Sequence, residues 1–216
     1  LRDTIDAANY KDYVLPVMFV KYLSDSYTDA VEELSKQYSG IRLERQKKYL
    51  PFMVAEGCSF YDLYQQRFAD NIGQLMNAAM RQIEADNNQQ LAGVLSAVDY
   101  NSENALGTRE HKNAILRDLL EDFEPLDLRP SAIEVKEGQV PADVIGDAYE
   151  YMIGQFASMA GKKAGSFYTP AAVSEIMARI VDVQPGERVY DPTCGSGSLL
   201  IKAAKKQNSK EVSIYG

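Results

Sequence analysis

The sequence predicts an α + α/β protein, with an all-helical N-terminal domain over residues 1–140 and the beginning of a doubly wound α/β domain over residues 141–216. Two observations support this prediction. Apolar residues at helical spacing run through the first half without any strand-like alternation. After the proline-containing stretch from Glu124 to Pro141, a strand, a glycine-rich loop, a helix and a second strand follow one another, as in the opening unit of a parallel sheet.

The first half is expected to consist of short helices. A buried helix at Tyr10–Ser24, broken or kinked near Pro16, precedes a helix from Thr28, a capping-type residue, to Tyr38. The remaining expected helices are Arg42–Met53, Ser59–Phe68, Asn71–Glu84, a segment with the apolar stripe Leu91, Val94, Leu95 and Val98, and Ala114–Phe123. These stripes predict a helical domain that buries its apolar faces against one another.

From Asp143 onward the sequence predicts a mixture of helices and strands. One helix is expected to present the apolar face Ile145, Ala148, Met152, Phe156 and Met159. Thr169 and Pro170 then open another helix as N-cap and first helical residue, with an expected buried stripe of Val173, Ile176, Met177, Ile180 and Val181. The following elements are a strand at Arg188–Tyr190, a loop at Asp191–Gly197, a helix at Ser198–Lys206 and a strand at Glu211–Tyr215.

The composition is that of an ordinary globular protein, with 45% hydrophobic and 25% charged residues over 216 positions. The longest dense apolar run, Tyr13–Val20, falls far short of the ~20 residues that span a bilayer, so no membrane helix is expected. Acidic residues precede this run where an export signal carries positive charge, so no secretory signal is expected either.

Cysteine and histidine are scarce, which excludes several kinds of site. Cys58 and Cys194 are too few for a disulfide framework and favour a reduced, cytoplasmic protein. No His/Cys cluster has the spacing of zinc ligands, so no metal site is expected. His111 stands in a strongly charged stretch, which is typical of a solvated helix residue and argues against a hydrolase triad.

Charge is unevenly distributed along the chain. Residues 1–143 carry 24 acidic and 15 basic side chains, a net charge of −9, whereas residues 144–216 carry 7 and 8, a net charge of +1. Because lysine and arginine supply most non-specific affinity for DNA, the acidic first half is expected to bind duplex DNA poorly by itself. If DNA is the substrate, a partner or a region missing from this sequence is expected to supply much of the binding surface.

The loop Asp191–Gly197 is the candidate ligand site, since ligands meet the carboxyl ends of parallel strands. Its glycines could serve only to make a tight turn, and that alternative stays open. A dinucleotide fingerprint needs glycine where Leu200 stands, and no P-loop has its residues in order, so NAD, FAD and nucleoside triphosphates are disfavoured. S-adenosylmethionine, which carries an ammonium and a sulfonium, suits a loop that begins with a carboxylate.

Two motifs resemble those of a known family. Ser166-Phe-Tyr-Thr-Pro170, followed by Val189-Tyr-Asp-Pro-Thr-Cys-Gly-Ser-Gly197, resembles the paired cofactor motifs of amino-group DNA methyltransferases. With the N-terminal segment Asp6–Asp25, the chain resembles the N-terminal portion of the methylation (M) subunit of a type I restriction-modification enzyme, an adenine-specific DNA methyltransferase. The resemblance implies an S-adenosylmethionine-dependent, Rossmann-like methyltransferase domain.

The resemblance also implies roles for individual residues. Tyr168, Thr169 and Pro170 would line the methionyl end of the cofactor, and the loop beneath it would be formed by Asp191, Thr193, Gly195 and Gly197. For Thr169 and Pro170, a simple helix cap remains the alternative. No catalytic residue is assigned, because the eight prolines are all separated and the family's Asn/Asp-Pro-Pro-aromatic motif is absent.

The chain begins with Leu1 rather than methionine and ends on an expected strand, so a truncated methyltransferase domain that is inactive alone is expected. The implied partners are DNA, reached through a complex, a specificity subunit, a second M subunit and a restriction subunit. Three alternatives remain: a helical assembly module that docks onto a specificity subunit, another adenine methyltransferase of the same motif order, including a single-chain restriction-methylation enzyme, and a nucleotide-binding protein.

Overall fold

The computed structural model describes residues 7–37, 50, 52–135, 141–159, 169, 171–194, 197–205 and 212–216. Contacts divide the chain into two compact units, Leu1–Tyr149 and Glu150–Gly216. The described part of the first unit is helical, and that of the second holds a small parallel sheet. The expected order, a helical region followed by the start of an α/β unit, is therefore confirmed. The predicted domain boundary at residue 140 stays a prediction, because the helix that begins at Pro141 runs across the division between the units.

The first unit is organised around one long helix, α1 (Ala7–Gln37), which continues through Pro16. The predicted separate helix from Thr28 is therefore wrong, and of the break or kink expected near Pro16, the break is excluded. Tyr13 and Val17, on either side of the proline, are 6% and 1% exposed, and this burial holds the helix together despite one missing backbone hydrogen bond. Thr28 is not a cap, because its Oγ1 donates to the carbonyl of Ser24 at 2.9 Å, one turn earlier in the same helix.

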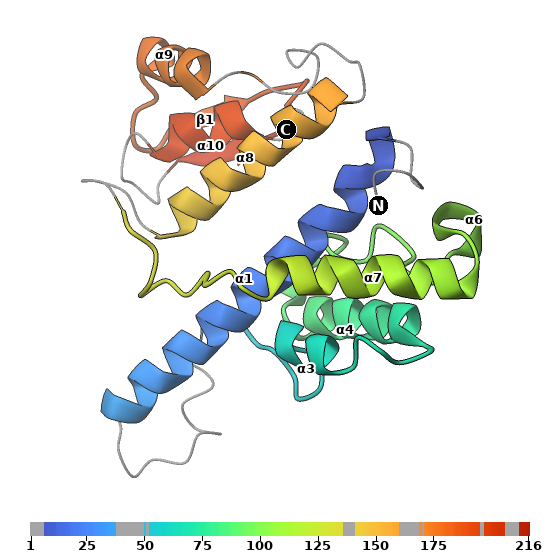
Figure 1. Ribbon diagram of the computed structural model, residues 1–216. Coiled ribbons are helices and arrows are strands. Elements are labelled where there is room, and N and C mark those ends of the chain that lie inside the picture. The colour runs from blue at the N-terminus through green and yellow to red at the C-terminus, as the bar shows by residue number, and fades with distance from the viewer. Residues whose placement is uncertain are drawn as a thin grey trace. The chain divides into compact units, whose positions relative to one another are not determined.

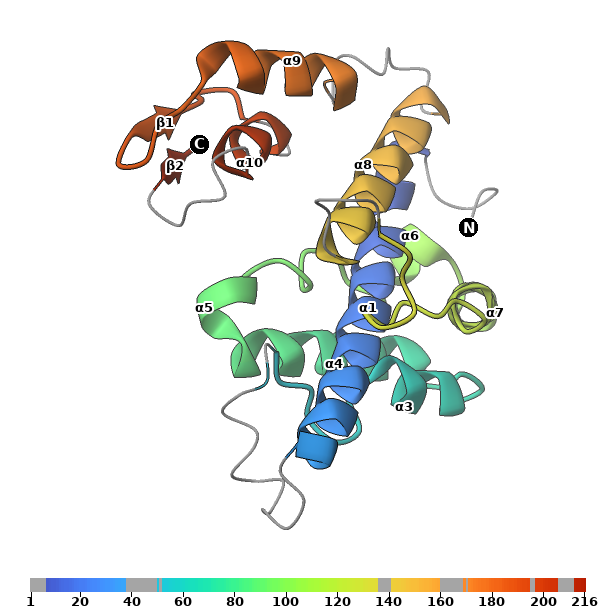
Figure 2. The same cartoon turned by 90° about the vertical axis from the view of Figure 1, so that its left-hand side faces the viewer.

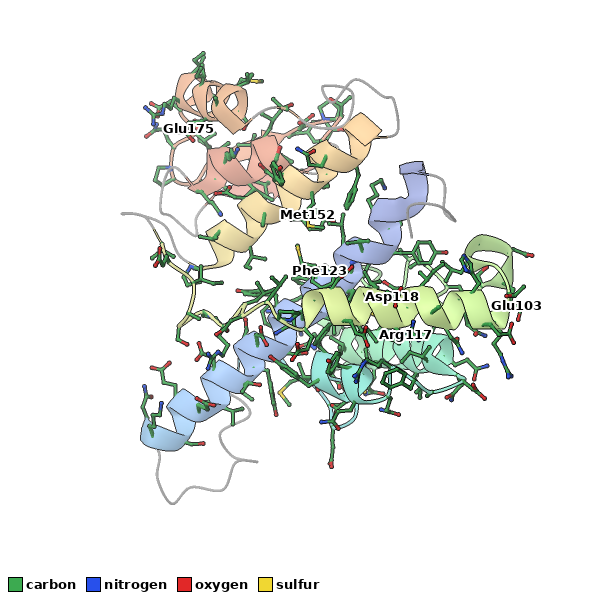
Figure 3. The ribbon with its side chains drawn as sticks, viewed as in Figure 1. Glu103, Arg117, Asp118, Phe123, Met152 and Glu175 are labelled. Carbon is green, nitrogen blue, oxygen red and sulfur yellow. The ribbon has the colours of Figure 1, made fainter. Side chains whose placement is uncertain are left out.

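Three further helices complete this unit: α3 (Phe60–Gln65), α4 (Ile72–Asp86) and α7 (Arg109–Phe123) (Figure 1). Helices α3 and α7 pack on α1, and α4 packs on α3 and α7. The four helices supply the core, whose fully buried members include Leu23, Phe60, Leu63, Ile72, Met76, Met80, Ile83 and Leu116. Ser59 begins α3 with a capping box, in which its Oγ accepts from the amide of Asp62 and the Asp62 carboxylate accepts from the amide of Ser59. Phe123, the last residue of α7, is also buried (Figure 3).

The connection between α4 and α7 contains two single-turn helices, α5 (Asn88–Leu91) and α6 (Glu103–Leu106). The predicted helix through Leu91 and Val98 is wrong, because residues 92–98 form turns and Gly93 has φ +74°. Glu84 holds these turns: its carboxylate accepts from the amides of Leu95 and Ser96 and from the hydroxyl of Ser96. Burial acts to raise the pKa of Glu84, but these hydrogen bonds outweigh it and lower the pKa below 4.5.

The predicted helix Arg42–Met53 lies mostly outside the described residues, since 42–49 and 51 are not described. Residues 52–54 are not helical. Met53 instead forms two backbone hydrogen bonds with the side chain of Asn87, at 2.8 Å to its Oδ1 and 2.7 Å from its Nδ2. This exchange fixes the segment that leads into α3 against the C-terminal end of α4.

Tyr100 anchors the same connection to α1. Its side chain is completely buried, its hydroxyl donates to the carbonyl of Tyr13 at 2.8 Å, and the two rings meet edge to face at 5.6 Å. Gly73 of α4 makes this fit possible, because a Cβ atom there would lie 2.5 Å from the carbonyl oxygen of Tyr100. The close approach of α4 to the Tyr100 backbone thus requires glycine.

A buried ion pair lies at the centre of the first unit. Lys21 and Asp25 of α1 are each 1% exposed, and their Nζ and Oδ2 atoms are 2.7 Å apart. Tyr61 completes the cluster, because its hydroxyl donates to Asp25 Oδ1 at 2.6 Å and accepts from Lys21 Nζ at 2.9 Å. The ammonium also lies 4.7 Å from the centre of the Tyr61 ring. Each charge therefore has several partners, as burial in an apolar interior demands.

The chain leaving α7 returns along α1 as a strap, which we define as residues 124–133. Asp25 Oδ2 accepts from the amide of Leu128 at 2.8 Å, and Asp29, one turn further along α1, accepts from the amide and hydroxyl of Ser131 at 2.8 and 2.7 Å. Two acidic residues at i, i+4 spacing thus fix the strap to α1.

The second unit contains the C-terminal part of α8 (Pro141–Met159), α9 (Ala171–Val181), β1 (Arg188–Tyr190), α10 (Ser198–Lys205) and β2 (Ser213–Tyr215). The two strands are parallel, with Val189 paired to Ile214. Helix α9 packs on α10 (Figure 2), and a small core of Ala178, Val183 and Ala203 lies beneath Val189.

The predicted buried stripe of α9 is exposed in this structure. Its members Val173, Ile176, Met177, Ile180 and Val181 are between 43% and 77% exposed. The helix instead buries its small residues Ser174 and Ala178, which are 0% and 4% exposed and allow the close approach of α10. Glu175, labelled in Figure 3, pairs with Arg179 at 2.8 Å on the exposed surface of this helix.

Among the described residues, no helix is long and apolar enough to cross a membrane. The same residues contain no group of three or more His, Cys, Asp and Glu side chains placed to hold a metal ion.

Candidate cofactor-binding site

The candidate loop lies at the carboxyl edge of the two parallel strands. Asp191 follows β1 directly, and its amide donates to the carbonyl of Tyr215 at 3.0 Å, which extends the strand pairing by one bond. The loop then leads into α10, whose first residue is Ser198. Because the free amides of a helix N-terminus and the ends of two strands meet here, this edge offers several donors to a ligand.

A short turn fixes the orientation of the Asp191 side chain. Its Oδ1 accepts from the amide of Thr193 at 2.9 Å and from the Thr193 hydroxyl at 3.1 Å. Among the described residues, Oδ2 accepts no hydrogen bond. The carboxylate is half-buried and Thr193 is exposed. Asp191 is thus held in one orientation with an oxygen left to accept from a ligand.

Gly197 closes the loop with a backbone that favours glycine. Its φ is +74°, its amide donates to the carbonyl of Cys194 at 2.8 Å, and its carbonyl accepts from Ile201 in the first turn of α10. A Cβ atom at this position would meet nothing within 4 Å. The space next to Gly197 is therefore open, and a side chain would fill it.

The floor of the loop is tightly packed. A Cβ atom on Gly216 would lie 2.6 Å from the sulfur of Cys194 and 3.1 Å from a methyl carbon of Leu200. Leu200 itself is 5% exposed. A leucine in the core thus occupies the place where a dinucleotide-binding fingerprint has glycine, and the backbone at the end of β2 fits against Cys194 only because residue 216 has no side chain.

The structure places three of the seven predicted cofactor-binding residues in this loop: Asp191, Thr193 and Gly197. Thr169 is described separately, as a half-buried residue ahead of α9. Tyr168, Pro170 and Gly195 lie outside the described residues, as does the predicted N-terminal capping of α9 by Thr169 and Pro170. The roles of all seven residues stay predictions.

A polar cluster between α8, α9 and α10 was not predicted from the sequence. Lys202 of α10 donates from Nζ to the hydroxyl of Ser174 on α9 at 2.8 Å and lies 3.6 Å from Oε2 of Glu150 on α8. One sequence signal could have indicated this cluster: Lys202 lies between Leu200 and Ala203 on the same helix, and both of these residues are buried. A charge at that place on an amphipathic helix calls for a polar partner.

Two family models match the chain. The model of the HsdM N-terminal domain matches residues 1–123, and the model of the N-6 DNA Methylase family matches residues 140–216. The first match ends at Phe123, the last residue of α7, and the second begins one residue before α8 at Pro141. The first family therefore covers most of the helical unit, and the second covers the strand–loop–helix–strand unit with its candidate loop.

Individual relatives are named as methylase or methyltransferase subunits of type I restriction systems. The type I restriction enzyme MpnII methylase subunit of Mycoplasma pneumoniae is 29% identical over all of this chain and 44% of its own length, and the MjaIX methylase subunit of Methanocaldococcus jannaschii is 26% identical over all of this chain and 40% of its own. The crystal structure of a type I restriction-modification system methyltransferase subunit from Streptococcus thermophilus superposes with a TM-score of 0.70 at 27% identity, covering 100% of this chain and 49% of that one.

The chain thus spans less than half the length of these relatives. Its fold agrees with the solved relative over the whole of its own length. Because the HsdM N-terminal domain model covers more than half of the sequence, the chain belongs to the HsdM family, the methylation (M) subunits of type I restriction-modification enzymes, and corresponds to their N-terminal portion.

Proposed function

We propose that this chain provides the cofactor-binding start of an S-adenosylmethionine-dependent methyltransferase that modifies the exocyclic amine of adenine in DNA. The observation that carries the proposal is the loop at the carboxyl edge of β1 and β2, where Asp191 is held by Thr193 and the space beside Gly197 is open. The match of residues 140–216 to the N-6 DNA Methylase family supports the same assignment.

The chemistry of the loop suits this cofactor. When bound, S-adenosylmethionine supplies a methyl group on a sulfonium, which makes the methyl carbon electrophilic. The Asp191 carboxylate favours the positively charged methionyl end, and the amides near Gly197 and at the start of α10 can approach the ligand closely. In the proposed site, Tyr168, Thr169 and Pro170 line the methionyl end, and Thr193 and Gly195 complete the loop beneath it.

The residues that would receive the adenine are not in this sequence. Amino methyltransferases that resemble it hold the flipped base through an Asn/Asp-Pro-Pro-aromatic motif, and none of the eight prolines here adjoins another. Alignment of the acceptor accounts for much of the rate in a direct transfer. We therefore expect the 216 residues alone to incorporate no tritiated methyl group into unmethylated DNA, and incorporation above background would contradict this placement of the catalytic residues.

The distribution of charge supports a role within a complex. With a net charge of −9 on residues 1–143, this part of the chain has little means of neutralising phosphates. We propose that a specificity subunit, a second M subunit and a restriction subunit are partners, that DNA is reached through this complex, and that the complex works in the cytoplasm. The chain alone should then show no salt-sensitive gel shift with duplex DNA at physiological ionic strength.

Isothermal titration calorimetry with S-adenosylmethionine tests the cofactor assignment, using the full-length subunit that contains these residues. Gly197→Val should abolish binding, because the side chain fills the open space beside the loop and φ +74° disfavours a β-branched residue. The matched control is Gly186→Val, at φ +87° in the turn before β1, where a Cβ atom also meets nothing within 4 Å.

The two variants impose similar backbone strain, so only the position of the new side chain relative to the loop separates them. The proposal requires that Gly186→Val binds like the wild type while Gly197→Val, folded by circular dichroism, does not. Equal affinity of the two variants would contradict the assignment of the loop.

A further inference from the structure

A small pocket on the surface of the first unit is lined by three arginines. It lies between the turn that follows α3 and helix α7, and its volume is about 200 Å³. The arginines are Arg67, Arg109 and Arg117. They surround Phe68, a large apolar residue that is nevertheless 68% exposed. We refer to this feature as the Phe68 pocket.

Arg67 gives the pocket a fixed wall. Its Nε donates to Oε1 of Glu121 on α7 at 2.9 Å, and its Nη1 donates to the carbonyl of Tyr64 at 2.9 Å. The guanidinium lies 4.1 Å from the centre of the Tyr64 ring and 4.5 Å from that of Phe68. The Phe68 ring thus rests on a cation that is itself held in place, so it is preorganised for contact while remaining exposed.

The other two arginines keep donors for a partner. Nη2 of Arg109 lies 3.8 Å from Oδ2 of Asp70, too far for a hydrogen bond, and the two side chains are 59% and 86% exposed. Among the residues that the structure describes, the acid partner of Arg117 is its neighbour Asp118, at 3.1 Å (Figure 3). Exposed pairs of this kind contribute little to stability, and each guanidinium has five N–H donors. Both arginines can therefore bind a further carboxylate.

The charges around the pocket favour a protein segment over DNA. Three arginines outnumber the two carboxylates that line the pocket, Asp70 and Glu110, although residues 1–143 carry a net charge of −9. Asp118 and Glu121, which pair with the arginines, stand beside the pocket and would repel a chain of phosphates. A single carboxylate can instead lie between the guanidinium groups. Arginine and aromatic side chains are also the residue types enriched at protein interfaces.

We propose that the Phe68 pocket is a docking site for a protein partner, which inserts one acidic side chain between Arg109 and Arg117 and lays an apolar side chain on Phe68. The inference rests on the proposed function in one respect, since the partner is expected among the subunits of the proposed complex. An arginine–carboxylate pair beside a preorganised aromatic ring has the character of an interface hot spot. The site gives the helical unit a role in assembly that is separate from the cofactor loop of the second unit.

Photocrosslinking identifies the occupant. The photoreactive residue p-benzoylphenylalanine is incorporated in place of Phe68 in the full-length subunit, which is then assembled with its partner subunits and DNA and irradiated. The expected adduct, mapped by mass spectrometry, joins position 68 to a partner segment with Asp or Glu next to an apolar residue. An adduct with DNA, an adduct with a segment that has no acidic residue, or no adduct in a complex of wild-type affinity would overturn the proposal.

Binding measurements test the same site without a photoreactive residue. Phe68→Ala and the double variant Arg109→Gln/Arg117→Gln should each weaken association of the full-length subunit with its partner subunits about tenfold, in biolayer interferometry at physiological ionic strength. The matched control is Arg81→Gln, an exposed arginine of α4 that does not line the pocket. It should leave the affinity unchanged, and thermal unfolding followed by circular dichroism should show that all the variants are folded.

The outcomes separate this inference from the function on which it rests. A wild-type subunit that joins no partner contradicts the proposed complex, and the docking site with it. A wild type that assembles, with Phe68→Ala and the double arginine variant binding just as tightly, contradicts the docking site alone. An equal loss of affinity in Arg81→Gln would also overturn it, because the effect would then follow from overall charge rather than from the pocket.

Discussion

Replacing Asp25 by alanine should destabilise the helical unit more than any single exchange on the surface of α1. Asp25 is 1% exposed and accepts hydrogen bonds from Lys21, Tyr61 and the amide of Leu128. Its removal leaves the Lys21 ammonium buried without a counter-charge, a change that costs about 3–5 kcal/mol in proteins. For a chain of this size, such a loss lowers the melting temperature by about 6–20 °C.

The matched control is Asp29→Ala, one turn further along the same helix. Asp29 also accepts two hydrogen bonds from the strap, but these bonds are exposed, so the expected loss is about 0.5–1.5 kcal/mol. Urea denaturation followed by circular dichroism measures both free energies of unfolding. The double variant Lys21→Met/Asp25→Leu should recover most of the loss, since it removes both buried charges.

Two results would refute this reasoning. If Asp25→Ala and Asp29→Ala cost the same, burial of the ion pair is not what makes Asp25 important. If the double variant is no more stable than Asp25→Ala, the stranded ammonium is not the cause of the loss.

Three further predictions concern other features. Gly73→Ala should lower the free energy of unfolding in urea by about 1–3 kcal/mol, because the new methyl group lies 2.5 Å from a backbone oxygen. Gly146→Ala, in open space on α8, should instead raise it by about 0.5–1 kcal/mol. Equal effects of the two variants would contradict the crowding at Gly73. Glu84→Gln should be destabilising at pH 7. Since hydrogen bonds hold the pKa of Glu84 below 4.5 against the effect of burial, its contribution is complete above that pH, and the difference from the wild type should shrink as pH falls below it. S-adenosylmethionine should slow the alkylation of Cys194 in the full-length subunit, as measured by mass spectrometry. Cys58 is the control and should be alkylated slowly with or without the ligand, because burial and nearby Asp86 raise its pKa. Unchanged alkylation of Cys194 would place the ligand elsewhere.

The sequence predicted helices best where local signals and tertiary packing agree. Ser59 and Asp62 form the capping box that begins α3, and the apolar stripe of α4 faces the core. The division of α1 into helices at Tyr10–Ser24 and Thr28–Tyr38 was wrong because Thr28 was interpreted as a cap, whereas its hydroxyl donates to the carbonyl of Ser24 inside one continuous helix. The helix also continues through Pro16, where the residues on both sides are buried. Local propensity yields to tertiary contacts at such positions.

The stripe of α9 shows a different limit. Its five large apolar residues correctly indicate an amphipathic helix, but periodicity does not tell which face a neighbour covers, and here Ser174 and Ala178 face α10. The loop at Asp191 was predictable because its residues are contiguous in the sequence. The polar cluster of Lys202, Ser174 and Glu150 was not predictable, because these residues lie on three different helices and come together only in the folded chain.

The strap has a consequence for the order in which the helical unit folds. Its hydrogen bonds join Leu128 to Asp25 and Ser131 to Asp29 across 103 and 102 residues. Closing so long a loop carries a large entropic cost, so these bonds form after the helices have assembled. The strap should also be the first part to detach, and the amide protons of Leu128 and Ser131 should exchange with solvent through an opening smaller than global unfolding. The strap therefore opens and closes in an equilibrium separate from global unfolding, and the carboxylates of Asp25 and Asp29 determine its stability.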